Sequence, residues 1–198
     1  MIELAALTPL WTTSRASGIA ALLCASLAIA AGVLMALKPI GLRRGRLELR
    51  TAHEALALAT FALLAVHAVS LFLDPVLRPG LAGILLPFGS AYERLGTALG
   101  QLAAYGMLGL GLTFYVRRHL GSQRWRRAHR FVPVFWGLAV GHALLTGTDA
   151  RSWWFLVSLG APVLAAVALL AQRYGSAPVA AVGVVGGDPL ARHDRRAE

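Results

Sequence analysis

The sequence predicts an all-α protein, a polytopic membrane helix bundle of about five transmembrane helices. Of its 198 residues, 57% are hydrophobic, and the mean hydropathy of +0.64 is well above that of a soluble globular domain. Apolar stretches of about 20 residues, long enough to cross a bilayer, recur along the chain. Basic residues gather in alternate loops between these stretches, which indicates how the helices are oriented.

Five spans follow one another and occupy most of the chain. They run from about 16 to 37, 51 to 73, 95 to 116, 128 to 146 and 153 to 172. We therefore expect an extracytoplasmic segment over 1–15, one membrane domain over 16–173 and a disordered, Gly-, Ala-, Pro- and Arg-rich cytoplasmic tail over 174–198. The Pro- and Gly-broken stretch over 78–96 is too short to cross; it forms a cap or interfacial helix at the outer mouth, or a loop without a special role.

Positive charge marks the cytoplasmic side of the predicted bundle. The loop after the first span contains Lys38, Arg43, Arg44, Arg46 and Arg50, and the loop after the third contains Arg117, Arg118, Arg124, Arg126, Arg127 and Arg130. The positive-inside rule then places the N-terminus outside and the C-terminus in the cytoplasm. The net charge of +10 reflects topology rather than a nucleic-acid-binding face. We expect a multi-pass protein of the cytoplasmic membrane, surrounded by lipid.

Four histidines lie within two of these spans. His53 and His67 lie on the second span, and His129 and His142 lie on the fourth. Both spans start in the cytoplasm, and a rise of 1.5 Å per residue separates the members of each span by about 21 Å and about 19.5 Å. The spacing predicts two pairs at matching depths, one near each surface: His53 with His129 inside, and His67 with His142 outside.

Such pairs suit b-type haem, whose iron takes a neutral imidazole on each face. Two axial histidines saturate the iron, which favours electron transfer over oxygen binding, and two stacked haems would let an electron cross in two short hops. A zinc or copper site fits less well, because each depth supplies only two ligands and the single Cys24 lies in the first span. The alternative is a haem-free transporter or assembly scaffold, whose histidines hydrogen-bond neighbouring helices.

Ideal helix geometry favours this arrangement on the second span but not on the fourth. Fourteen residues bring His53 and His67 to within about 40° of each other, so they share a face. Thirteen residues leave His129 and His142 about 140° apart. Pro133 lies between them and lacks a backbone N–H, so a kink or local rewinding there could realign the two histidines.

The pattern His-x13-His on one span and His-x12-His two spans later resembles the ferric reductase-like transmembrane domain family, which includes NADPH oxidases, ferric-chelate reductases and the haem-binding membrane subunit of the methionine sulfoxide reductase system. The resemblance covers about residues 15 to 172 and includes WRRAHR before the fourth span and GHALLTGTD at its end. It implies that His53 and His129 bind the iron of an inner haem b, and His67 and His142 that of an outer one.

The resemblance also suggests roles for other residues near the two haems. Phe135 would lie between the haems; alternatively, Phe135 and Trp136 face lipid or fill space. Arg15 could pair with a propionate of the outer haem or lie among the lipid headgroups. At the inner face Arg126 and Arg130 are candidates to meet propionates, as are Arg43, Arg46 and Arg127, although most of these could serve topology only.

The resemblance implies the membrane subunit of an oxidoreductase. Unlike the oxidases, this sequence has no Gly-rich dinucleotide loop and no FAD- or NAD(P)H-binding domain of its own. We therefore expect electrons to come from a separate cytoplasmic flavin (FAD or FMN) reductase or from a quinol. The acceptor would lie outside the membrane: an exported flavin- or molybdenum-containing reductase, ferric chelates or oxygen.

Overall fold

The computed structural model describes residues 8–37 and 45–175, and this part of the chain is helical with short connections. The helices are α2 (Pro9–Leu37), α3 (Arg46–Leu73), α4 (Gly80–Leu85), α5 (Arg94–Leu112), α6 (Arg117–Leu120), α7 (Ser122–His129), α8 (Val132–Thr146) and α9 (Trp153–Gly175). Lys38, Arg43 and Arg44, most of the expected extracytoplasmic segment over 1–15, and residues 176–198 of the tail expected over 174–198 lie outside the described residues.

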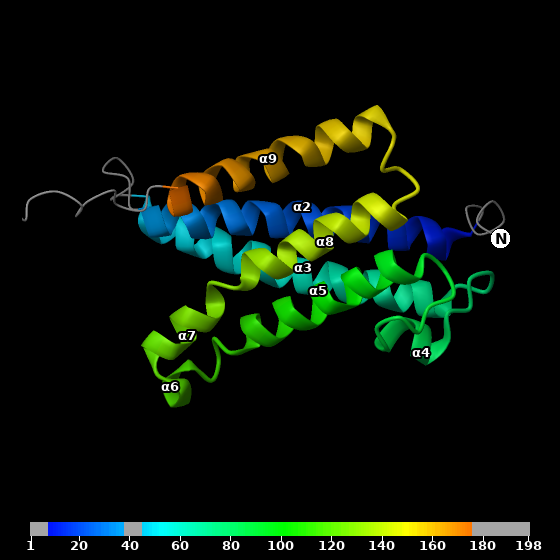
Figure 1. Ribbon diagram of the computed structural model, residues 1–198, viewed down its shortest axis with the longest axis horizontal. Coiled ribbons are helices and arrows are strands. Elements are labelled where there is room, and N and C mark those ends of the chain that lie inside the picture. Colours follow the sequence, from blue (N-terminus) through cyan, green and yellow to red (C-terminus); the bar gives the residue numbers. More distant parts are fainter. Residues whose placement is uncertain (1–7, 38–44, 176–198) are drawn as a thin grey trace, which may run out of the picture.

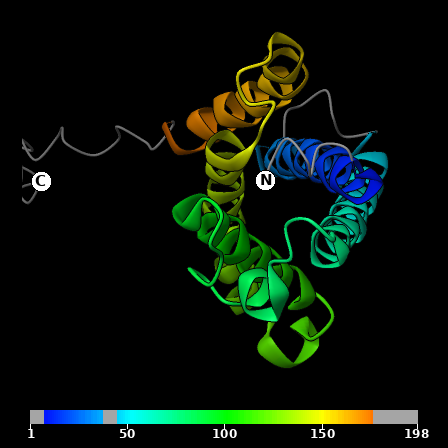
Figure 2. The same ribbon diagram turned by 90° about the vertical axis from the view of Figure 1, so that its right-hand side faces the viewer.

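The long helices lie side by side along the long axis of the molecule, and successive ones run in opposite directions (Figure 1). α2 packs against α3 and α9, and α5 packs against α8. Seen end-on, the α2–α3 pair faces the α5–α8 pair (Figure 2). Helix α4 lies at one end of the bundle, and α6 and α7 lie at the other. We call these the α4 end and the α7 end.

Four of these helices, α2, α3, α5 and α9, are long and apolar enough to cross a membrane. Large apolar side chains are exposed on the outside of the bundle, among them Leu58, Val69, Leu112, Val157 and Leu164. A soluble protein rarely exposes so much apolar surface, whereas a bilayer accepts it. The length, composition and surface of the helices therefore indicate a membrane protein.

The fourth predicted span, over 128–146, is not one continuous helix. Helix α7 ends at His129, Arg130 and Phe131 form a turn, and α8 begins at Val132. Pro133 lies in the first turn of α8, where its missing N–H costs little because N–H groups there have no acceptor within the helix. Helix α8 alone has 15 residues, fewer than the roughly 20 that a bilayer requires.

Other helix ends differ from the predicted spans because hydropathy locates apolar runs rather than the first and last hydrogen-bonded turns. Helix α2 already begins at Pro9, within the expected extracytoplasmic segment, and buries Trp11. Helix α3 begins at Arg46, five residues before the apolar run, with a polar first turn that contains Glu48. Helix α5 ends at Leu112, and α9 includes Tyr174 and Gly175, which were expected to belong to the tail.

The stretch expected to be a cap or a plain loop contains the short helix α4, which is tied to α5. Gln101 Nε2 donates hydrogen bonds to the carbonyl oxygens of Gly83 (2.7 Å) and Ile84 (3.0 Å). The Tyr105 hydroxyl donates to the carbonyl of Leu85. These bonds satisfy the carbonyls at the end of α4 and hold this segment across the α4 end of the bundle.

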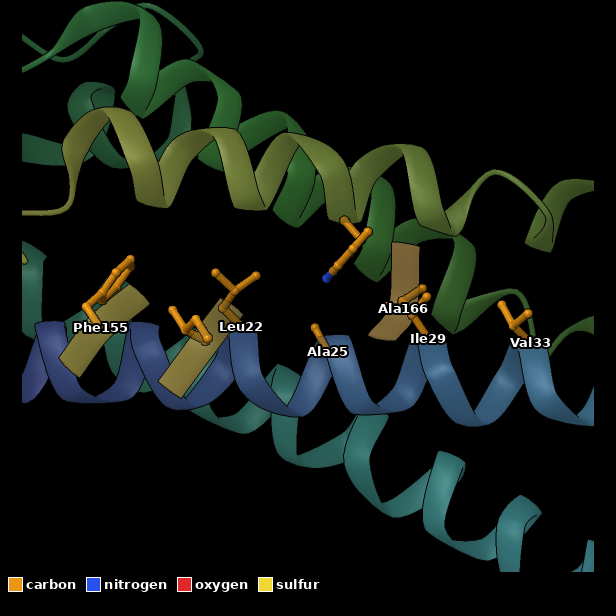
Figure 3. Packing of buried hydrophobic residues seen from close by; sticks show 8 residues of the cluster. Leu22, Ala25, Ile29, Val33, Phe155 and Ala166 are labelled. Atoms are coloured by element: carbon orange, nitrogen blue, oxygen red, sulfur yellow. The ribbon is translucent and has the colours of Figure 1, made fainter. Parts of the chain in front are cut away.

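The apolar core lies where α2, α8 and α9 meet (Figure 3). Its buried members are Leu22, Ala25, Ile29 and Val33 of α2, Trp136 of α8, and Phe155, Leu159 and Ala166 of α9. The indole Nε1 of Trp136 donates a hydrogen bond of 3.0 Å to Ser26 Oγ. Of the two alternatives for Trp136, facing lipid or filling space, the structure supports the second: this residue is 4% exposed and joins α8 to α2.

Candidate functional site

The four histidines that the sequence singled out form two facing pairs. The ring centroids of His53 and His129 are 6.2 Å apart, with the ring planes at 79°. Those of His67 and His142 are 6.3 Å apart, with the planes at 83°. The first pair lies nearer the α7 end and the second nearer the α4 end, so the structure brings together the histidines that the sequence matched in depth.

The interruption between α7 and α8 permits this arrangement. An ideal helix would turn His129 and His142 about 140° away from each other. The turn at Arg130 and Phe131 breaks that continuity directly before Pro133. His129 thus faces His53 from the last residue of α7, while His142 faces His67 from within α8.

Three of the four imidazoles are fixed by backbone carbonyls of a neighbouring helix. The distances are 2.8 Å from His53 Nδ1 to Ala28 O, 2.8 Å from His67 Nδ1 to Ser14 O, and 2.8 Å from His142 Nδ1 to Gly96 O. A carbonyl oxygen can only accept a hydrogen bond, so Nδ1 carries the proton in each ring. The Nε2 atom is left with a lone pair, as a metal ligand requires.

A glycine lies four residues after each of these carbonyls and lets the histidine ring approach the helix. A Cβ placed on Gly18 would lie 2.9 Å from His67 Nδ1, and one on Gly100 would lie 2.6 Å from His142 Nδ1. At Gly32 the corresponding distance, to His53 Cε1, is 3.3 Å. Small residues allow such close approach between membrane helices. Each ring therefore rests in a cradle made by a carbonyl and the glycine one turn later.

The cradles on α2 repeat with the same period as the histidines on α3. Ser14 and Ala28 are 14 residues apart, as are Gly18 and Gly32, and as are His53 and His67. Because α2 and α3 are antiparallel (Figure 1), the alignment that places Ser14 beside His67 also places Ala28 beside His53. Sequence reasoning missed these residues. Two glycines in the first span with the spacing of the two histidines in the second are the signal that could have found them.

A cavity of about 460 Å³ lies beside the His67–His142 pair. Its lining is largely apolar and includes Ile19, Leu22, Leu64, Ala104, Leu108 and Phe155. This volume falls in the range typical of cofactor and ligand pockets. The two imidazoles thus border a largely apolar space between the α2–α3 and α5–α8 pairs.

Two phenylalanines lie between the levels of the histidine pairs. A Cβ on Gly106 of α5 would lie 2.0 Å from Phe135 Cδ1, so the Phe135 ring packs directly on this helix. Phe61 of α3, between His53 and His67 in sequence, packs in the same way on Gly111 and also lines the cavity. The structure therefore places Phe135 inside the bundle and adds Phe61, which sequence reasoning missed.

An ion pair stands at the α4 end of the cavity. Arg15 of α2 donates to Asp149 in the loop between α8 and α9, with 3.0 Å between Arg15 Nε and Asp149 Oδ2. Both residues line the cavity. Nearby, the Tyr92 hydroxyl donates to the carbonyl of Thr146 at 3.2 Å. Burial and the charge of Glu93 raise the pKa of Tyr92, so it remains a neutral hydrogen-bond donor.

The α7 end is arranged differently from the α4 end. Arg126 and Arg130, the candidates for meeting propionates, are both exposed. Trp125 stacks on His129, with centroids 5.0 Å apart and planes at 25°. The Nδ1 of His129 is buried and has no hydrogen-bond partner among the described residues.

The two pairs fit the axial positions of a haem. An imidazole nitrogen lies about 2 Å from a first-row metal, so one metal atom between two facing rings places their centroids roughly 6 Å apart. The observed 6.2 and 6.3 Å agree with this value. Three of the rings also have Nε2 free to ligate, and the His67–His142 pair borders an apolar cavity. The donor set therefore suits a group that takes one imidazole on each face of a flat ring.

Comparison of the chain with known protein families, with curated proteins and with solved structures found no match.

Proposed function

We propose that the protein is a di-haem b electron-transfer protein of the cytoplasmic membrane, similar to the ferric reductase-like transmembrane domain. The observation that carries the proposal is the pair of facing imidazoles at each of two levels of one helix bundle. Bound haem would supply an iron that accepts and returns one electron. A haem-free scaffold would explain the bonds from Nδ1 to neighbouring helices, but not why a second imidazole faces each ring.

In this proposal His53 and His129 hold one haem, and His67 and His142 hold the other, through Nε2. The carbonyls that accept hydrogen bonds from Nδ1 keep the required tautomer and make the imidazoles stronger ligands. Fourteen residues separate the two levels by about 21 Å along α3. Phe61 and Phe135 fill the space between them with apolar rings and thereby keep water out.

We further propose that α2, α3, α5, the α7–α8 segment and α9 all cross the bilayer, with the α7 end in the cytoplasm. The arginines of α6 and α7 support this orientation through the positive-inside rule. On α8, Val134, Leu144 and Leu145 are exposed, as expected of a helix that faces lipid. In this orientation Pro9, at the start of α2, lies outside, and Gly175, at the end of α9, lies on the cytoplasmic side.

Electrons would enter at the α7 end and leave at the α4 end. The donor would be a separate cytoplasmic flavin reductase or a quinol, and the acceptor an exported flavin- or molybdenum-containing reductase, ferric chelates or oxygen. The Arg15–Asp149 ion pair would then lie at the exit side. Arg15 is the basic residue of the described cavity lining, so it is placed to meet a carboxylate there.

The haem content of the purified protein tests the proposal. From a haem-replete host we expect b-type bands in the reduced-minus-oxidised spectrum and two haems per chain. His67→Leu and His53→Leu should each retain one haem, because the two sites are separate. His119→Leu, which changes an exposed histidine of α6, is the matched control and should retain both. Wild-type protein without b-type bands would refute the proposal.

A further inference from the structure

His129 is held differently from the other three histidines. Each of the other rings is held by a backbone carbonyl and a glycine of an adjacent helix, α2 or α5. His129 Nδ1 is buried without a hydrogen-bond partner among the described residues. An imidazole without this bond is free to turn about its own axis unless another contact restrains it.

The helix break explains why the carbonyl is missing. On α5, Gly96 accepts the bond from His142. His129 precedes His142 by 13 residues. If α7 and α8 formed one continuous helix antiparallel to α5, the carbonyl that accepts from His129 would therefore lie 13 residues after Gly96 on α5, at Gly109. The turn at Arg130 and Phe131 removes this register, and a Cβ on Gly109 would meet nothing within 4 Å.

In place of a carbonyl bond at Nδ1, the His129 imidazole has a ring stacked against its face. Trp125, one turn before His129 on α7, lies nearly parallel to the imidazole with 5.0 Å between the centroids. The indole in turn contacts Phe114, which follows the end of α5, with centroids 6.0 Å apart. The Arg117 guanidinium lies 3.6 Å from the centroid of the Phe114 ring. Phe114, itself contacted by Arg117, therefore restrains the Trp125 indole, which can in turn fix the plane of the imidazole.

We propose that Trp125 is a positioning residue for the inner haem site. Its indole face sets the plane of the His129 imidazole and hence the 79° angle to His53, as carbonyls do for the other rings. This inference rests on the proposed function, because it requires that His53 and His129 hold a haem. It assigns to the tryptophan of WRRAHR a role at the inner site only.

The test compares Trp125→Leu, which removes the stack, with Trp125→Phe, which keeps an aromatic face. The control is Trp153→Leu, because Trp153 lies on α9 and is 77% exposed. Haem content and the low-temperature electron paramagnetic resonance spectrum of the oxidised protein are measured for each variant. The spectrum of His67→Leu, which retains only the inner haem, identifies the inner signal.

We expect Trp125→Leu to shift or remove the inner signal and to leave the outer signal as in wild type. Trp125→Phe should return the inner signal towards that of wild type, and Trp153→Leu should change neither. An unchanged inner signal in Trp125→Leu, equal changes in both signals, or a Trp125→Phe spectrum as altered as that of Trp125→Leu would overturn the inference. Wild-type protein without haem would instead refute the proposed function, so the two failures are distinguishable.

Discussion

The imidazole of His142 stands almost perpendicular to that of His67, at 83°, with 6.3 Å between the ring centroids. Carbonyls from two different helices fix the two planes, Ser14 of α2 for His67 and Gly96 of α5 for His142. The angle is therefore a property of the bundle itself. A site whose ligands are already oriented loses less entropy when the cofactor binds.

The first prediction concerns the electronic structure of the proposed haems. Perpendicular imidazoles interact equally with two iron d orbitals, which stay close in energy, whereas parallel imidazoles separate them. Since the planes lie at 79° and 83°, both oxidised haems should give a highly anisotropic low-spin signal in electron paramagnetic resonance. A rhombic spectrum, typical of parallel planes, would contradict the observed ring orientation.

The second prediction concerns the glycine cradle of the outer site. In Gly100→Ala the new methyl group would lie 2.6 Å from His142 Nδ1, so the imidazole must move. We expect the variant to lose the outer haem and retain the inner one. Gly137→Ala on α8 is the control and should retain both, because its Cβ would meet nothing within 4 Å. Equal haem content in the two variants would argue against the cradle.

The third prediction concerns acid stability and Asp74, at the end of α3. Asp74 is 1% exposed and accepts hydrogen bonds from the Thr8 hydroxyl (2.6 Å) and from the backbone N–H groups of Val76 and Leu77 (2.9 Å each). Burial alone would raise the pKa of Asp74, but these bonds lower it below its ordinary value. The stabilisation is therefore complete above the unfolded pKa of about 3.9 and is lost as the pH falls through the lower folded pKa.

Thermal unfolding in detergent measures this effect. At neutral pH, Asp74→Asn should be less stable than wild type by about 1–3 kcal/mol, because the neutral amide has only one acceptor oxygen for these bonds. Below about pH 4 the difference should shrink, because the unfolded wild-type chain then binds a proton at Asp74 that the folded chain binds only at lower pH. A difference that stays constant from neutral to acidic pH would show that the Asp74 charge has no such role.

The sequence predicted the helical class, the approximate positions of four of the five spans and the pairing of the four histidines. Those features follow from hydropathy and helical rise, which depend on one helix at a time. The helix break that brings His129 and His142, about 140° apart on an ideal helix, to face their partners could not be predicted. Pro133 indicated a kink, but the chain breaks at Arg130 and Phe131, and Pro133 then starts α8.

The contacts that hold the histidine rings could not be predicted from the sequence either. The acceptors at Ser14, Ala28 and Gly96 are backbone carbonyls, which every residue has, so only the packing of helices selects them. The pairing of Arg15 with Asp149 likewise joins residues 134 positions apart. By contrast, the matched 14-residue spacings of Gly18 with Gly32 and of His53 with His67 were visible in the chain.

The most direct test of the central claim is electron transfer across a membrane that contains only this protein. Proteoliposomes enclosing ferricyanide would be treated with dithionite from outside, and the absorbance of ferricyanide would be followed. We predict rapid ferricyanide reduction with wild-type protein, slow reduction with His67→Leu or His53→Leu, and the wild-type rate with His119→Leu. Wild-type protein that carries two haems but reduces the enclosed ferricyanide no faster than protein-free liposomes would contradict the account.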